Sequence, residues 1–368
     1  MRSCAAIPSR CRLITFLALL GVASGLALSF VLPLPTNSRC PAPSPVAPTH
    51  LSMVADSNAS DQAASSKRDP FRRPDRGKLL VLGGTGFLGN SVAARAVLDG
   101  YSVTSLSRRG LPPSLADGRA TVRERGARRL RRGGRGGGGG DYSLAATRVD
   151  YRAGDARDSA VIASILSEGG YVGIVHSVGV LFDPASRLSR LNRLASGSGS
   201  VPDQQPETGS YDEVTRRTAF AAMDAAEDYI RSGGGGVGGT PLPFVFSSSA
   251  EVGWQDTRSG RFVERTSPGW MRRYLAAKRA VETRLLDTSQ RTPTLLRPIV
   301  FRSSLIYSAD RIASLPVTSA FYVGSRLGLP FVDRPVTVQA LSSAMLRSIR
   351  TPDVIGIQSF RQVDQLNQ

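Results

Sequence analysis

The hydrophobic pattern of the chain changes its period repeatedly after residue 78. Short apolar runs, typical of strands buried on both faces of a sheet, alternate with stretches in which apolar residues recur at helical spacing. The predicted strands cover residues 78–84, 101–107, 145–155, 171–179, 243–249 and 292–301. The predicted helices cover residues 87–100, 158–170, 211–232, 270–287 and 336–349.

Strands that alternate with helices predict an α/β fold, a doubly wound parallel Rossmann sheet, because parallel neighbours need a crossover connection. The pattern weakens beyond Arg302, so we expect residues 302–368 to form a small C-terminal cap over the carboxyl edge of the sheet, where open sheets bind ligands. The irregular stretch at 181–210 is predicted to be an insertion.

Residues 1–68 are predicted to be a targeting leader. Three arginines within the first twelve residues precede an uncharged apolar stretch that ends in small residues, and no Asp or Glu occurs before Asp56. This order is typical of a secretory-type signal, with cleavage before Phe30. A retained membrane anchor is the alternative, because the apolar stretch is long enough to span a bilayer.

The segment after the apolar stretch is rich in Ser, Pro, Ala and Thr and cannot form a core. A signal followed by such a segment resembles the two-part leader of algae with secondary plastids, in which an aromatic residue such as Phe30 opens the transit part. We therefore expect delivery to a plastid, with a mitochondrion as the alternative. The folded domain is expected to begin at residue 69 and to continue to residue 368.

The net charge of +18 is unevenly distributed, with an excess of eight positive charges at residues 108–135, which span most of a predicted loop insertion at 110–141 and the arginines just before it. Residues 108–135 carry ten arginines against Asp117 and Glu124, and five glycines follow. Such Arg-Gly tracts can bind RNA phosphates. No aromatic residues interleave here to stack bases, so a solvated surface loop is favoured and RNA binding is a minor alternative.

The cysteines and histidines exclude several kinds of catalytic site. Cys4, Cys11 and Cys40 all lie in the leader, as does His50, so His176 is the single histidine of the predicted domain. A cysteine nucleophile and a thiolate or multi-histidine metal site are therefore excluded. His176 falls at the end of a predicted strand and is interpreted as a packing residue rather than a base.

Glycines mark the junction between the first predicted strand and the first predicted helix, in "VLGGTGFLG". Gly83 is expected to allow a tight turn, Gly86 to let a pyrophosphate approach the backbone, and Gly89 to let the helix pack closely on the strand. The helix N-terminus would offer N–H groups to the phosphates. Thr85, Phe87 and Leu88 complete this predicted nucleotide-binding turn.

The turn "GGTGFLG", with "SSS" and "YLAAK" further on, resembles the extended and atypical short-chain dehydrogenase/reductase superfamily. The resemblance covers the chain from about Lys78 to the C-terminus. It implies a nicotinamide cofactor, with Asp155 near the adenine and a loop of Ser177, Val178 and Gly179 beneath the nicotinamide ribose.

The second predicted strand ends in Ser107, Arg108 and Arg109, where an acid would bind the ribose 2′-hydroxyl of NAD. Arginine at this place can pair with a 2′-phosphate, so NADP is favoured over NAD. Alternatively, these arginines merely begin the basic loop.

The resemblance also implies a catalytic site at Tyr274, Lys278 and Ser249. Tyr274 and Lys278 lie four positions apart and thus on one helix face. In the family the lysine lowers the tyrosine pKa and holds the ribose, the tyrosine transfers the substrate proton, and the serine bonds the substrate oxygen. After the three serines this chain has the sequence "AEVGW", which differs from the sequence of many family members at that place.

The phrases "VHSVGVLFD" and "LRPIVF" are most similar to the organellar branch of the superfamily. That branch includes the nucleotide-binding accessory subunit of respiratory complex I and the dehydrogenase-like protein of the coenzyme Q synthesis complex. The resemblance implies an oxidoreductase that acts on a small hydrophobic, prenylquinone-like substrate or supports its synthesis. A non-catalytic assembly subunit at a membrane surface or in an organellar complex is the alternative. No metal is expected.

Overall fold

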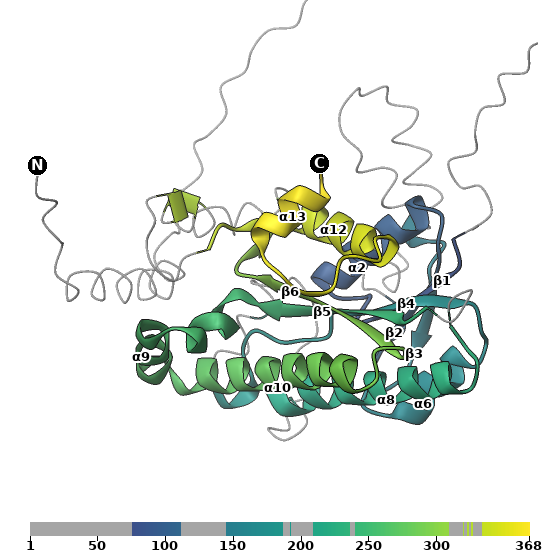
Figure 1. Ribbon diagram of the computed structural model, residues 1–368, viewed down its shortest axis with the longest axis horizontal. Coiled ribbons are helices and arrows are strands. Elements are labelled where there is room, and N and C mark those ends of the chain that lie inside the picture. The colour runs from purple at the N-terminus through teal and green to yellow at the C-terminus, as the bar shows by residue number, and fades with distance from the viewer. Residues whose placement is uncertain are drawn as a thin grey trace, which may run out of the picture. The chain divides into compact units, whose positions relative to one another are not determined.

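The computed structural model describes residues 76–111, 145–186, 192, 209–235, 240–308, 319, 322–323, 325–326 and 333–368 (Figure 1). The predicted leader and most of the predicted basic insertion lie outside the described residues, as does most of the predicted insertion at 181–210. Those three predictions are therefore not tested.

A seven-stranded parallel sheet forms the centre of the described domain, in the order β3-β2-β1-β4-β5-β6-β9. Its strands are β1 (Lys78–Leu82), β2 (Ser102–Ser107), β3 (Asp150–Ala153), β4 (Tyr171–His176), β5 (Leu242–Ser249), β6 (Leu296–Ser303) and β9 (Gly356–Gln358). The doubly wound Rossmann prediction is confirmed, since chain order runs outward in both directions from β1.

Helices cover both faces of this sheet (Figure 1). One face carries α2 (Phe87–Leu98), α12 (Val338–Arg350) and α13 (Phe360–Leu366), and the other carries α6 (Ser159–Leu166), α8 (Thr218–Arg231) and α10 (Gly269–Arg291). Shorter elements are η2 (Pro184–Ser186), the π-helical turns η4 (Asp212–Arg217), the 3₁₀ helix η5 (Ala250–Asp256) and α9 (Arg258–Thr266).

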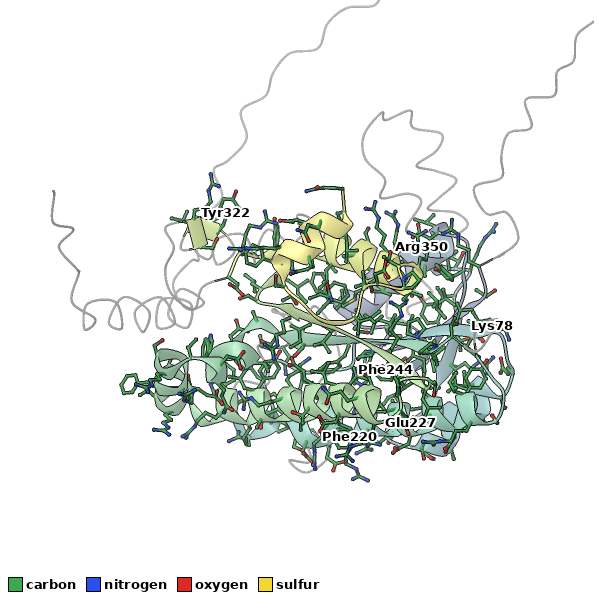
Figure 2. The ribbon with its side chains drawn as sticks, in the orientation of Figure 1. Lys78, Phe220, Glu227, Phe244, Tyr322 and Arg350 are labelled. Atoms are coloured by element: carbon green, nitrogen blue, oxygen red, sulfur yellow. The ribbon has the colours of Figure 1, made fainter. Side chains whose placement is uncertain are left out.

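Each face of the sheet has its own apolar core, because successive side chains of a strand point to opposite sides. In β1, Leu80 and Leu82 join the core under α6, α8 and α10, whereas Leu79 and Val81 join the core under α2 and α12. Phe244 of β5 is fully buried in the first of these cores, between the sheet and α10 (Figure 2). Strands buried on both faces explain why the sequence shows continuous apolar runs.

The C-terminal segment differs in part from the expected cap. Residues 338–366 belong to the layers of the main fold: β9 pairs with β6, and α12 packs beside α2. A separate two-stranded pair, β7 (Ile306–Tyr307) with β8 (Val336–Thr337), follows the end of β6. Most of the residues between β7 and β8 lie outside the described part of the chain.

Candidate functional site

The predicted site residues come from the carboxyl ends of neighbouring strands. β1 lies between β2 and β4, the point at which the strand order reverses, and β5 follows β4. Parallel strands end at one edge of the sheet, so the segments after β1, β2, β4 and β5 meet there. This edge at the reversal point is the place where open α/β sheets bind ligands.

The glycine turn between β1 and α2 has the geometry that the sequence predicts. Gly83 has a φ of +84°, which favours glycine, and its N–H donates to the carbonyl of Leu106 at 2.9 Å. A β-carbon on Gly89 would lie 2.2 Å from the carbonyl oxygen of Gly83 and 2.5 Å from Ser177 Oγ. Close packing therefore excludes a side chain at residue 89. Gly84 is similarly restricted, since its β-carbon would lie 2.2 Å from Ser105 Oγ.

Gly86 is different, because its surroundings within the protein are more open. A β-carbon there would meet one neighbour within 4 Å among the described residues, the carbonyl oxygen of Gly83 at 3.2 Å. Gly86 is the N-cap residue of α2, has no side chain to cap the helix, and is followed by a first turn without acids. A helix N-terminus of this kind fits a phosphate group. Thr85 and Phe87 beside it are partly exposed, whereas Leu88 is buried in the core.

The turn after β2 presents two exposed arginines. Ser107 Oγ donates to the carbonyl of Gly110 at 3.2 Å, which closes the turn over Arg108 and Arg109. Arg108 lies close enough to Asp155 to contribute to lowering the pKa of that carboxyl. The adjoining ends of β2 and β3 thus place these arginines and Asp155 in one region of the edge.

Asp155 is engaged by a residue that sequence analysis did not select. Arg157 donates to both oxygens of Asp155 at 2.5–3.0 Å and to Glu213 of η4 at 3.2 Å. The hydrogen bonds from Arg157 are the main cause that holds the pKa of Asp155 below its ordinary value. The ion pair with Arg157 therefore orients the carboxylate of Asp155 without help from a ligand. No sequence motif marks Arg157, but its place two residues after "GD" would have been a reason to examine it.

The loop after β4, residues 177–179, contacts both the glycine turn and α10. Ser177 Oγ donates to the carbonyl of Leu82 at 2.8 Å, and Val178 lies against Gly83. A β-carbon on Gly179 would lie 3.8 Å from Lys278 Nζ and 3.9 Å from Thr215 Oγ1. The loop predicted to pass beneath a nicotinamide ribose therefore lies directly beside the predicted catalytic lysine.

Tyr274, Lys278 and Ser249 are brought together as predicted. Lys278 Nζ lies 5.7 Å from the centre of the Tyr274 ring and 4.9 Å from that of Phe246, and it donates a hydrogen bond to the carbonyl of Ser247. Ser249, the last residue of β5, lies close enough to Tyr274 to affect the pKa of its phenol. The two helix residues and the strand end form one cluster.

The electrostatics of this cluster differ from the expectation that the family resemblance carries. Burial lowers the pKa of Lys278 to about 8, with Glu282 opposing that effect. Burial raises the pKa of Tyr274 and the charge of Glu251 adds to the increase, while the hydroxyl of Ser249 opposes it. The phenol of Tyr274 is therefore held neutral, because removal from water and a nearby carboxylate both disfavour a second anion.

Glu251 is a second residue that sequence analysis did not select. Its carboxylate accepts hydrogen bonds from Ser249 and, at 3.0 Å, from Ser304, and burial raises its pKa. The sequence showed it only as part of "AEVGW", the departure from the family pattern. An acid two residues after the candidate serine was the available signal.

Two further contacts fix α10 beside the sheet. Glu282 is buried, accepts a hydrogen bond from Ser248 and forms an ion pair with Arg302 at 2.6 Å. Arg273, one residue before Tyr274, forms a bidentate pair with the buried carboxylate of Asp183 at 3.0–3.1 Å. Glu282, Arg302, Arg273 and Asp183 were also missed by sequence analysis, because their partners lie far away in the chain.

His176 is a buried, neutral residue at the end of β4. Its side chain has no exposed surface, its Nε2 lies 2.9 Å from Thr218 Oγ1, and its ring lies 5.6 Å from that of Phe246. Burial lowers the pKa of His176 to about 3, and the positive charge of Lys278 contributes. These contacts agree with its interpretation as a packing residue.

Among the described residues, no group of three or more His, Cys, Asp or Glu side chains could hold a metal ion. In the same part of the chain, no helix is both long enough and apolar enough to cross a bilayer.

Comparison with known proteins gives distant matches. No protein-family profile matches the chain. A curated relative, MIOREX complex component 2 of Saccharomyces cerevisiae, is 21% identical over 315 residues, which cover 78% of this chain and 98% of the yeast protein.

Two of the solved structures that resemble the chain are a short-chain type dehydrogenase/reductase from Mycobacterium ulcerans and a UDP-glucose 4-epimerase from Bifidobacterium longum in complex with NAD⁺ and UDP. The first is 20% identical, with a TM-score of 0.47 and coverage of 79% of this chain and 90% of that one. The second is 16% identical, with a TM-score of 0.44 and coverage of 77% and 76%. The fold assignment itself rests on the strand order and the glycine turn described above. The chain has the doubly wound Rossmann fold that the sequence resemblance led us to expect.

Proposed function

We propose that this protein is an NADP(H)-dependent oxidoreductase of an organelle. The observation that carries the proposal is the proximity of Gly179 to Lys278, since a β-carbon on Gly179 would lie 3.8 Å from Lys278 Nζ. This contact joins the predicted cofactor loop to the cluster of Tyr274 and Ser249. The residues that we expect to hold the cofactor and the residue that we expect to transfer the proton are thus adjacent.

The residues at the carboxyl edge fit a dinucleotide. Gly86 and the N-terminus of α2 would hold the pyrophosphate, and Ser177, Val178 and Gly179 would lie along the nicotinamide ribose. Exposed Arg108 and Arg109 favour a 2′-phosphate, and hence NADP over NAD. When bound, the nicotinamide would supply or accept the hydride.

The chain's own residues would handle the proton and the substrate oxygen. Tyr274 is neutral and therefore suited to donating a proton to a carbonyl oxygen of the substrate. Lys278, buried beside the tyrosine ring, would hold the ribose hydroxyls. We propose a small hydrophobic, prenylquinone-like substrate, on the sequence resemblance to the organellar branch, and a membrane surface or an organellar complex as the place of action.

A second candidate function is a non-catalytic assembly subunit that binds NADP as a folding ligand. It is favoured by one observation, that the yeast relative is named as a component of a complex. RNA binding through the arginine-rich segment remains a minor candidate, and that segment lies mainly outside the described residues.

The experiment that tests the proposal is calorimetric titration of the full chain with NADPH and with NADH, together with mass spectrometry of any nucleotide and lipid that co-purify. We expect saturable binding with a preference for NADPH in the native protein and loss of binding in Gly86→Val, whose side chain would occupy the place of the pyrophosphate. Absence of binding of both nucleotides to folded native protein would overturn the proposal.

A further inference from the structure

Helix α9 presents an exposed phenylalanine that is surrounded by arginines. Phe262 is 55% exposed. Arg258, four residues before it, and Arg265, three residues after it, lie beside it on the same face of the helix, and Arg261 precedes it directly. All three arginines are exposed. These four residues are called the α9 patch below.

Packing on the opposite face of α9 fixes the rotation of the helix, and hence the exposure of Phe262. A β-carbon on Gly260 would lie 2.1 Å from the carbonyl oxygen of Trp254, so the backbone of α9 lies directly on η5. Glu264 is buried and forms an ion pair with Arg279 of α10 at 3.0 Å. Phe262 therefore cannot turn inward unless these contacts break.

The arginines of the α9 patch are not neutralised by neighbouring acids. Among the described residues, Arg258, Arg261 and Arg265 form no ion pair, and Arg261 donates to the backbone carbonyl of Gln255 at 2.8 Å. Arg258 and Arg261 lie near the N-terminus of α9, where the helix dipole disfavours cations, and the first turn contains no acid. The stability of α9 therefore does not explain this charge.

The α9 patch lies on the segment that connects the strand and the helix of the candidate site. β5 ends at Ser249, η5 and α9 follow, and α10 begins five residues before Tyr274. Figure 1 shows α9 at the end of the described domain where α10 begins. The patch therefore belongs to the same carboxyl edge of the sheet as the cluster of Tyr274 and Ser249.

We propose that the α9 patch docks the protein on the surface of an anionic membrane. The guanidinium groups would bind lipid phosphates, and Phe262 would enter the boundary between head groups and acyl chains. The inference rests on the proposed function, because a hydrophobic, prenylquinone-like substrate would be dissolved in that membrane.

A lipid surface fits the α9 patch better than a protein surface does. A stable protein interface has an apolar core made of several side chains. In α9, all of which is described, Phe262 is the one large apolar side chain that is exposed. A single aromatic residue among unpaired arginines suits shallow insertion between anionic head groups.

The test places a fluorophore in the α9 patch, so that binding through other parts of the full chain does not obscure the result. Phe262→Trp is combined with Trp270→Phe, which leaves the buried Trp254 as the one other tryptophan. Vesicles of phosphatidylcholine and phosphatidylglycerol carry brominated acyl chains, which quench a tryptophan that enters the bilayer. Ile355→Trp with Trp270→Phe is the matched control, because Ile355 is 56% exposed and lies outside the patch.

We expect the vesicles to quench the tryptophan introduced at position 262 and not the one introduced at position 355. Vesicles of brominated phosphatidylcholine alone should quench it far less, because they carry no net charge. Raising NaCl from about 0.1 M to about 1 M should weaken the quenching, since the screening length falls from about 10 Å to about 3 Å. Absence of quenching at position 262, or equal quenching at both positions, would overturn the inference.

A second set of variants tests the charge of the α9 patch. Replacing its three arginines by glutamine in the Phe262→Trp protein should raise the lipid concentration for half-maximal quenching at least about fivefold, the contribution of one basic residue near an anionic surface. The matched control replaces three exposed arginines of other helices by glutamine: Arg217, Arg231 and Arg291. Equal effects of the two triple replacements would overturn the inference.

Other occupants of the α9 patch would give different signals. Quenching by oligouridylate but not by lipid would indicate RNA, and a spectral shift that depends on protein concentration alone would indicate a second copy of the chain. Either result, without quenching by lipid, would overturn the inference. Titration of the same protein with NADPH separates the two proposals. Lipid quenching without NADPH binding would support docking and defeat the proposed function, whereas NADPH binding without lipid quenching would defeat docking alone.

Discussion

Gly89 packs so closely on Gly83 that a β-carbon on Gly89 would lie only 2.2 Å from the carbonyl oxygen of Gly83. The first turn of α2 is therefore packed directly on the end of β1, and this contact fixes the helix N-terminus at the reversal point of the sheet. Gly86 lies between these two glycines, and its own β-carbon would lie 3.2 Å from the same oxygen.

This difference predicts unequal effects of two alanine substitutions. Gly89→Ala should lower the free energy of unfolding by roughly 1–3 kcal/mol, the usual cost of overpacking, because backbone atoms would have to move. Gly86→Ala should cost much less, since its φ of −79° suits alanine and a shift of a few tenths of an ångström relieves its contact. Urea unfolding of both variants measures this. Equal losses would contradict the assigned packing role of Gly89.

The arginines after β2 predict cofactor selectivity. Replacing Arg108 and Arg109 by alanine should weaken NADPH binding by roughly 1–3 kcal/mol, the typical contribution of charge-assisted hydrogen bonds, and leave NADH binding nearly unchanged. Calorimetric titration with each nucleotide measures the difference. Arg231→Ala, an exposed arginine paired with Glu227 and Asp228, is the control for the loss of positive charge. Equal weakening of NADPH and NADH would refute the preference for NADP.

The sheet predicts that the basic insertion is dispensable for the fold. β2 and β3 pair directly, from Thr104 with Asp150 to Ser107 with Ala153, although the insertion separates them in the chain. Deleting residues 119–140 should therefore leave the thermal transition and NADPH affinity unchanged. Loss of nucleotide binding would show that the insertion is part of the site. Loss of RNA binding alone, in a filter-binding assay, would support the minor candidate function.

His176 predicts a loss of stability at acid pH. Its pKa is about 3 in the folded protein and near 6.5 in the unfolded chain, so the unfolded chain binds the proton first as pH falls. The buried, neutral His176 therefore makes a contribution to the free energy of unfolding that is fully present above pH 6.5. This contribution is lost progressively from pH 6.5 towards 3, by on the order of a few kcal/mol.

Urea unfolding from pH 7 to pH 4 measures this contribution. His176→Gln cannot take up a proton, so it should unfold with a smaller dependence on pH than the native protein. His50→Gln is the control, since His50 is the single other histidine of the chain. Identical pH profiles for the native protein and His176→Gln would show that the buried ring does not govern acid stability.

Local patterns were sufficient to predict most of the sheet and its helices. Strands β1, β4, β5 and β6 each contain an apolar run because helices cover them on both faces. β9 was missed since its three residues have no pattern of their own and become a strand by pairing with β6. α9 was missed for a related reason: its mostly polar sequence buries few side chains, among them Val263.

The candidate site could be predicted where a motif is local. Tyr274 and Lys278 are one helical turn apart, and the glycine turn joins a strand to the next helix, so sequence spacing alone places them. The contacts that set the chemistry are not local. Glu251 meets Ser304 across 53 positions, and Arg157 meets Glu213 across 56. The resemblance accordingly implied a lowered Tyr274 pKa, whereas burial and Glu251 raise it.

The choice between an enzyme and a scaffold depends on the hydroxyl of Tyr274. Tyr274→Phe removes one atom that acts only in proton transfer, so an enzyme should lose about 10²–10⁴-fold in rate with NADPH affinity nearly unchanged. Lys278→Ala should damage both, because the amine lies beside both the tyrosine ring and Gly179.

The most direct test of the proposed oxidoreductase is the prenylquinone content of cells in which Tyr274→Phe or Gly86→Val replaces the native protein. Both variants should accumulate as folded protein at the native level, measured by immunoblot of the soluble and membrane fractions. Our account predicts that neither variant restores the quinone content, since one lacks the proton donor and the other the cofactor. Full restoration by Tyr274→Phe, with none by Gly86→Val, would contradict catalysis and favour a scaffold that needs only bound nucleotide.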